Sequence, residues 1–187
     1  MNLAQLLSGC LKALGNAQDW PNYFDLSRQG FRLSFLALIL SVPCYYVCAV
    51  AVQTANAKID GVEAALPTTA FFMILATYAL MFVLVAYILS LIFDRTDRFR
   101  AWAIVRHWSV FFASFLAACL YGLSIAGILP FLIASYLALA IYLGTLVIDI
   151  RLAQKIAGFE WGAAILAGCI ITAMGLTVLM TGVAQFS

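Results

Sequence analysis

The sequence has very few charged residues for its length. Only 10% of its 187 residues are Asp, Glu, Lys or Arg, whereas 66% are hydrophobic. A soluble domain carries about 25% charged residues, so a water-soluble fold of this size would lack the polar surface to cover itself. The shortage of charge excludes a soluble globular protein and predicts that the lipid bilayer is part of its solvent. The net charge of +2 is also too small to indicate nucleic-acid binding.

Residues that build catalytic and metal sites are scarce as well. His107 is the single histidine, and no carboxylate lies at a spacing that indicates a catalytic triad. The sequence contains no P-loop, no dinucleotide-binding glycine pattern and no HExxH motif. Its five cysteines form no CxxC, and we interpret them as small packing residues. We therefore expect no enzyme, no cofactor and no metal site, with His107 lying at the membrane interface.

What the sequence does contain is long apolar runs, and the longest decides the number of spans. Trp108 to Ile148 covers 41 residues without a charged side chain. This is too long for one membrane helix and long enough for two joined by a turn. We place the turn at Tyr121–Gly127. The predicted hinge or kink residues are Gly122, Gly127 and Pro130 around this turn, and Pro43 in the first span.

Five predicted spans form one integral membrane domain over residues 1–187. They lie at about residues 31–52, 67–93, 102–121, 128–148 and 161–184, which makes the fold an all-α polytopic transmembrane helix bundle. Ahead of them, apolar side chains at helical spacing in residues 1–15 predict a short amphipathic helix, too short to span. This helix either lies in the membrane interface or packs on the bundle.

The basic residues indicate an orientation. Nine of the ten lie on one side of the five-span arrangement, and only Lys58 lies on the other. The four tryptophans also fall on the basic side, where we expect them in the headgroup region. By the positive-inside rule, the N-terminus is cytoplasmic and the C-terminus is outside. The charge pattern is typical of a bacterial protein, which places the chain in the inner (plasma) membrane.

The last span carries a predicted helix-packing face. Gly168, Gly175 and Gly182 recur every seven residues, with Thr172 between the first two. Small side chains at this spacing let another helix approach closely. That helix belongs either to the same chain or to a second subunit.

One ion pair is predicted on the cytoplasmic side. If the third and fourth spans form a hairpin centred between Ser124 and Ile125, Asp149 lies level with Arg100. Asp149 directly follows an apolar span, so we predict an ion pair between these two residues.

The turn region resembles the Yip family. Tyr121-Gly122-Leu123-Ser124 and Leu129-Pro130, at the opening of the fourth of five spans, are similar to a Gly-Tyr and Leu-Pro turn of that family, with the first pair reversed here. Asp25-Leu26 resembles part of the family's Asp-Leu-Tyr-Gly-type segment ahead of the first span. Yip proteins have five spans and a cytoplasmic N-terminal region, and are associated with membrane trafficking. The resemblance implies a non-catalytic, membrane-organising protein and carries over no catalytic residue.

Two functions remain open at this point. The first is a non-enzymatic scaffold or interaction partner that acts through helix packing and its cytoplasmic face. The alternative is a small permease or channel for a solute, working as an oligomer because five helices leave little room for a pathway. We expect no carboxylate within a span, and this weakens an ion-coupled carrier. The expected partners are the lipid bilayer and either a second copy or another membrane protein, with no nucleic acid.

Overall fold

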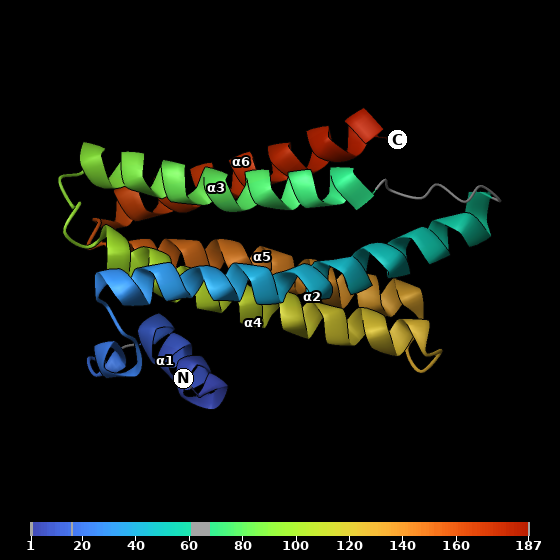
Figure 1. The fold of residues 1–187 in the computed structure, drawn as a ribbon, viewed down its shortest axis with the longest axis horizontal. Coiled ribbons are helices and arrows are strands. Elements are labelled where there is room, and N and C mark those ends of the chain that lie inside the picture. Colours follow the sequence, from blue (N-terminus) through green and yellow to red (C-terminus); the bar gives the residue numbers. More distant parts are fainter. Residues whose placement is uncertain (1, 16, 61–67, 187) are drawn as a thin grey trace.

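The computed structural model describes residues 2–15, 17–60 and 68–186, without the side chains of residues 58–60 and 179–186. These ranges are almost entirely helical, with five long helices and a short one ahead of them (Figure 1). The elements are α1 (Leu3–Leu14), the 3-10 helix η1 (Trp20–Tyr23), α2 (Arg28–Asp60), α3 (Thr68–Ile92), α4 (Phe99–Ile125), α5 (Phe131–Lys155) and α6 (Trp161–Phe186).

The predicted five-span helical bundle is confirmed. Helices α2 to α6 are each long and apolar enough to cross a membrane. The shortest have 25 residues, which at about 1.5 Å per residue exceeds the roughly 30 Å of a hydrocarbon core. Two boundaries differ from the prediction and bear on the site. Helix α4 continues to Ile125, beyond the expected end at 121, and α5 continues from Ile148 to Lys155.

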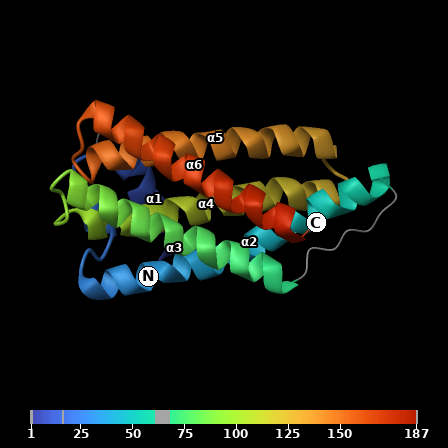
Figure 2. The same cartoon turned by 90° about the horizontal axis from the view of Figure 1, so that it is seen from above.

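Helix α4 lies at the centre of the bundle. Helix α2 packs along it, α5 lies antiparallel to it, α1 and α3 also contact it, and α6 covers α5 and α3 (Figures 1 and 2). All residues of α4 from Trp102 to Phe111 are buried. Seven of these ten side chains are apolar, as expected for a segment enclosed on every side.

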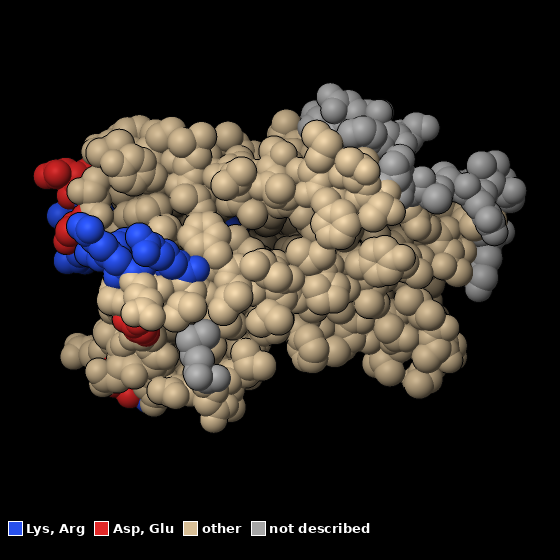
Figure 3. Space-filling model, viewed as in Figure 1, with Lys and Arg blue, Asp and Glu red and all other residues tan. Residues whose placement is uncertain are grey.

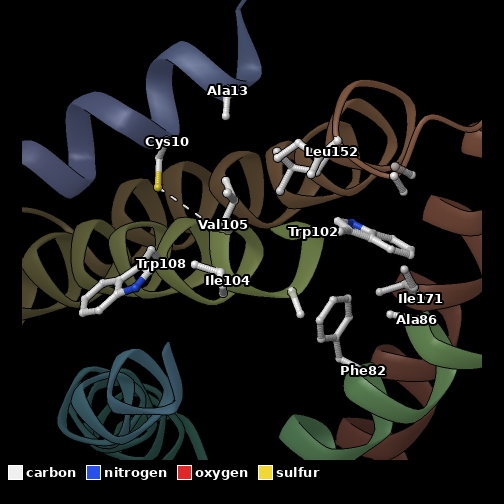
Figure 4. Packing of buried hydrophobic residues seen from close by; sticks show 14 of the residues in the cluster. Cys10, Ala13, Phe82, Ala86, Trp102, Ile104, Val105, Trp108, Leu152 and Ile171 are labelled. Carbon is white, nitrogen blue, oxygen red and sulfur yellow. Dashed lines mark hydrogen bonds between the residues drawn. The ribbon is translucent and has the colours of Figure 1, made fainter. Parts of the chain in front are cut away.

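The apolar core is built around Trp102, near the end of the bundle that carries the charged loops. The rings of Phe82 and Phe159 stand edge-on to Trp102, with centroids 6.0 and 5.5 Å away. Leu152 and Ile171 complete the cluster from α5 and α6 (Figure 4). Edge-to-face aromatic pairs contribute about 0.5–1.5 kcal/mol each beyond the area they bury. This core ties α3, α4, α5 and α6 together.

Two of the four tryptophans expected in the headgroup region are buried inside the bundle. Trp102 and Trp108 are buried, at 0% and 3% exposure, because the first turns of the central helix are covered on all sides. Trp161, at the start of α6, is 54% exposed.

Helix α1 packs on the bundle, which is one of the two alternatives left open by the sequence. Leu6 and Cys10 are buried against the bundle, where α1 contacts α4 and α5. Leu3, Leu7 and Leu11 share a neighbouring stripe and stay exposed. The helix therefore packs on the bundle through one part of its apolar face and presents leucines outward through another.

The predicted hinge residues have separate outcomes. Pro43 lies inside α2, and Figure 1 shows that α2 bends in its second half. Gly127 (φ +74°) lies in the turn between α4 and α5, and Pro130 caps the start of α5, as expected for turn residues. Gly122 lies inside α4, so it is not part of the turn in which the sequence placed it.

Candidate functional site

The most unusual feature of the bundle is an ion pair buried between two spans. Arg106 on α4 donates from Nε to Oδ1 of Asp149 on α5 at 2.9 Å, and its Nη2 lies 3.4 Å from Oδ2. Both side chains are only 3% exposed. The guanidinium carbon also lies 3.8 Å from the centroid of the Phe82 ring. Arg106 is thus held by a two-pronged carboxylate contact and by an aromatic face from α3.

The pair sits inside the apolar part of the molecule. Arg106 is seven residues into α4 and Asp149 is six residues before the end of α5, which puts both about 10 Å from the helix ends. Burying one charge at such a depth is far more costly than burying a matched pair. Ionisable groups inside spans are rare and commonly mark functional sites.

The predicted Arg100–Asp149 ion pair is wrong, since Asp149 pairs with Arg106. The error comes from the register of the hairpin. The midpoint between the end of α4 and the start of α5 is residue 128, about three residues later than assumed. Because residues pair across an antiparallel hairpin, this shift moves the partner of Asp149 by nearly two turns along α4. The expectation that no carboxylate lies within a span is wrong for the same reason.

A cavity of about 180 Å³ lies next to this ion pair, among α2, α3, α4 and α5. Its polar lining comes chiefly from three tyrosines, one each from α2, α3 and α5. The Tyr78 hydroxyl also interacts with the Arg106 guanidinium. The residues lining the cavity are Tyr45, Cys48, Leu75, Tyr78, Val110, Ala113, Ser114, Ala117, Ala138, Ile141, Tyr142 and Thr145.

Two of the tyrosine hydroxyls have spare hydrogen-bonding capacity. Across the described part of the chain, the side chains of Tyr45 and Tyr142 make no hydrogen bond, although both line the cavity. Ser114 and Thr145 instead donate to backbone carbonyls of their own helices. A phenol can both donate and accept. The cavity therefore offers two free hydroxyl groups beside a charge-compensated pair.

No family model, curated protein or solved structure matches this chain. The resemblance to the Yip family therefore stays a prediction, and the site has to be interpreted from its own geometry.

His107 is fully buried, so its predicted position at the interface is wrong. Its Nδ1 lies 2.9 Å from Oγ of Ser34 on α2. Ser34 donates to the Phe31 carbonyl, so Nδ1–H of His107 donates to the serine oxygen. Nε2 has no partner among the described residues, and the rings of Phe35 and Phe82 stand edge-on to the imidazole. This contact joins α2 to α4 and leaves the serine hydroxyl at 1% exposure.

Sequence reasoning missed Arg106 and the tyrosine cavity as a site. A signal for Arg106 was present, since it follows a wholly apolar turn from Ala101 to Val105 and precedes the long uncharged run. Nothing in the spacing of the three tyrosines shows that α2, α3 and α5 bring them together.

The glycine face of α6 packs inside the chain at two positions. A Cβ on Gly168 would lie 2.4 Å from Cγ1 of Ile150 on α5, and one on Gly175 would lie 2.9 Å from the Tyr78 ring on α3. Thr172 between them is half-buried. The side-chain environment of position 182 lies outside the described residues. Gly168 and Gly175 thus let α5 and α3 approach α6 closely.

The contacts of α1 are structural. Lys12 is paired with Asp19 and donates to the Tyr23 hydroxyl at 2.6 Å, which fastens α1 to η1. The hydrogen bond from Lys12 lowers the pKa of Asp19. Burial raises the pKa of the Cys10 thiol to about 11, so this cysteine stays protonated at neutral pH and packs as an apolar residue.

Proposed function

We propose that this protein is a small, non-enzymatic membrane permease that binds a neutral, hydrogen-bonding solute in the tyrosine cavity. The observation that carries the proposal is the pair of unpartnered hydroxyls, Tyr45 and Tyr142, in a cavity beside the buried Arg106–Asp149 pair. The arginine and the carboxylate compensate each other, so the site has no net charge to attract an ion. Ligand pockets of this kind combine a mainly apolar lining with a few placed polar groups.

The buried carboxylate changes the balance between the two functions considered from the sequence. The sequence weakens an ion-coupled carrier because it predicts no carboxylate within a span. Asp149 lies within a span, and it is joined to Arg106, which contacts the cavity tyrosine Tyr78. Such residues in membrane proteins commonly lie on substrate pathways. The geometry therefore favours the permease over the scaffold.

A catalytic role for the buried serine and histidine is not part of the proposal. Ser34 and His107 contact each other, but both are sealed in the protein at 1% and 0% exposure. The nearest buried carboxylate, Asp149, already accepts two hydrogen-bond contacts from Arg106. A nucleophile has to reach its substrate, and neither group lines the tyrosine cavity.

The orientation and compartment also belong to the proposal. The α3–α4 and α5–α6 connections and the start of α2 lie at the same end of the bundle, where acidic and basic side chains gather (Figures 1 and 3). We assign this end to the cytoplasm by the positive-inside rule, and the membrane to the bacterial inner membrane.

Flux into liposomes tests the function. Purified protein is reconstituted, and glycerol uptake is followed by light scattering, with K⁺ and Cl⁻ fluxes as charged comparisons. We expect glycerol entry above that of protein-free liposomes, with no gain for either ion. Tyr142→Phe removes a cavity hydroxyl and should slow uptake. Tyr136→Phe is the matched control, because Tyr136 on the same helix is 64% exposed and does not line the cavity.

The flux result also decides between the permease and the scaffold. If the wild-type protein moves glycerol no faster than empty liposomes, or if Tyr136→Phe and Tyr142→Phe slow it equally, the permease proposal fails. The scaffold would then be the better account, supported by the charged end of the bundle and by the resemblance to the Yip family.

A further inference from the structure

The tyrosine cavity opens sideways, toward the lipid. A second cavity of about 170 Å³ lies between α2 and α3 and shares four lining residues with the first. Helices α2 and α3 make little contact with each other in the described part of the chain. Figure 3 shows a hollow between them on this face, with a small basic area at its edge. The shared residues are Tyr45, Leu75, Tyr78 and Val110.

The crevice formed by these two cavities changes from apolar at its outer end to polar at its inner end. At its outer end, Ile39 on α2 and Phe72 on α3 are 63% and 51% exposed, on the surface that faces hydrocarbon. At its inner end are the hydroxyls of Tyr45 and Tyr142. An occupant that satisfies both ends has an apolar tail and a polar head.

The charge and the volume restrict that head further. Arg106 is already neutralised by Asp149, so a charged head would meet no free counter-charge. A protein cavity of about 150 Å³ holds a benzene-sized molecule of about six non-hydrogen atoms. The inner cavity, at about 180 Å³, therefore suits a head group of glycerol size. A phospholipid with its phosphate and two chains is too large and carries charge.

We infer that the crevice between α2 and α3 takes a neutral single-chain amphiphile directly from the bilayer. Its hydroxylated head binds Tyr45 and Tyr142, and its tail leaves between Ile39 and Phe72. This inference rests on the proposed function, because it names the route and the substrate class of the same cavity. Such an amphiphile enters from the membrane without crossing the charged end of the bundle, and free glycerol binds the same head-group site more weakly.

Photo-crosslinking tests the inference. Wild-type protein in nanodiscs is irradiated with a monoacylglycerol that carries a diazirine on its acyl chain, and labelled peptides are identified by mass spectrometry. We expect saturable labelling of the α2 and α3 segments that hold Ile39 and Phe72. Unlabelled monoacylglycerol should compete fully, the matching fatty acid anion weakly, and glycerol alone weakly because it lacks the tail.

Two tryptophan substitutions on α3 provide matched variants. Ala76 is exposed and lines the outer cavity, so Ala76→Trp should block the crevice and abolish the saturable labelling. Leu80 lies one turn further along α3, is 65% exposed and lines neither cavity, so Leu80→Trp should leave the labelling unchanged.

Three outcomes would overturn the inference: labelling spread evenly over lipid-facing helices, equal competition by the fatty acid, or the same labelling in Ala76→Trp and Leu80→Trp. The proposed function is judged separately. Glycerol flux that depends on Tyr142 while the amphiphile fails to label the crevice would leave the permease standing and refute the lateral route.

Discussion

At the scale of single residues, the buried Arg106–Asp149 pair stabilises the fold only while both charges are present. Two charges are removed from water, and their mutual attraction and the Phe82 ring offset that cost. Replacing both partners by apolar residues of similar size is often nearly neutral, whereas removing one leaves a buried charge with no counter-charge. The pair therefore makes the native packing of α3, α4 and α5 sensitive to any single change at either position.

A double-mutant cycle measures this asymmetry. Arg106→Met and Asp149→Leu should each lower the free energy of unfolding by about 3–5 kcal/mol, because each leaves one buried charge unpaired. The double variant should lose clearly less than the sum of the two. Unfolding in mixed micelles with increasing SDS, followed by circular dichroism, gives the three values.

Arg100→Met is the control for that cycle, since Arg100 forms no ion pair among the described residues. It should change stability little, alone or combined with Asp149→Leu. Strictly additive effects of Arg106→Met and Asp149→Leu would show that the two groups are not coupled in the folded protein.

At the scale of elements, the helix contacts explain why the site lies where it does. Helix α4 is held against α2 by the Ser34–His107 contact and against α5 by the Arg106–Asp149 pair. Helix α3 instead packs mainly on α6, where Gly175 faces Tyr78. Because α3 is drawn toward α6, it leaves a gap on its other side, next to α2. The crevice is thus a consequence of the close α3–α6 approach.

The α5–α6 contact gives a prediction at this scale. Gly168→Ala should destabilise the protein by about 1–3 kcal/mol, because overpacking at a tight contact forces the backbone to shift. The new Cβ would lie 3.1 Å from the backbone nitrogen of Ile150, which cannot move as freely as its side chain. The SDS unfolding titration reports the change.

Gly144→Ala is the matched variant in the middle of α5, where an added Cβ has nothing within 4 Å. It should be neutral or stabilising by up to about 1 kcal/mol, since alanine favours a helix more than glycine does. Equal losses in the two variants would contradict close packing at Gly168. A Gly168→Ala protein that loses a subunit in detergent and keeps its monomer stability would assign the glycine face to an oligomer interface.

At the scale of the whole molecule, five spans put the end of α6 at the opposite end of the bundle from the charged loops (Figure 1). An odd number of crossings separates the two ends of the spanning region, whichever way the bundle is inserted. The basic loops at one end then select one of the two orientations.

Reporter fusions test this arrangement in a bacterial host. Alkaline phosphatase fused after Ser187 should be active, because it is expected outside the cytoplasm. Green fluorescent protein at the same position should be dark if it is exported unfolded. A fusion in the loop after Ile92 should give the opposite pattern in both reporters. A fluorescent fusion after Ser187 would overturn the predicted orientation. Fluorescence of both this fusion and the fusion after Ile92 would overturn the five-span topology, because three spans separate the two positions.

The sequence by itself determined the lipid environment, the all-helical fold class and the number of spans. These properties depend on composition and on the length of apolar runs, which are local and additive along the chain. The run from Trp108 to Ile148 is the clearest case, since its uncharged length alone requires two helices. The turn at Gly127 and Pro130 was also predictable, because their backbone preferences act at the position where they stand.

Only the tertiary structure decided which side chains meet. A shift of about three residues in the centre of one hairpin exchanged Arg100 for Arg106 as the partner of Asp149, and it moved a carboxylate from a span end to the protein interior. The tyrosine cavity needs the rotation and the spacing of α2, α3, α4 and α5 together. Register and rotation depend on contacts between distant segments, and in lipid every span is apolar all round, so its sequence carries little signal for which face turns inward.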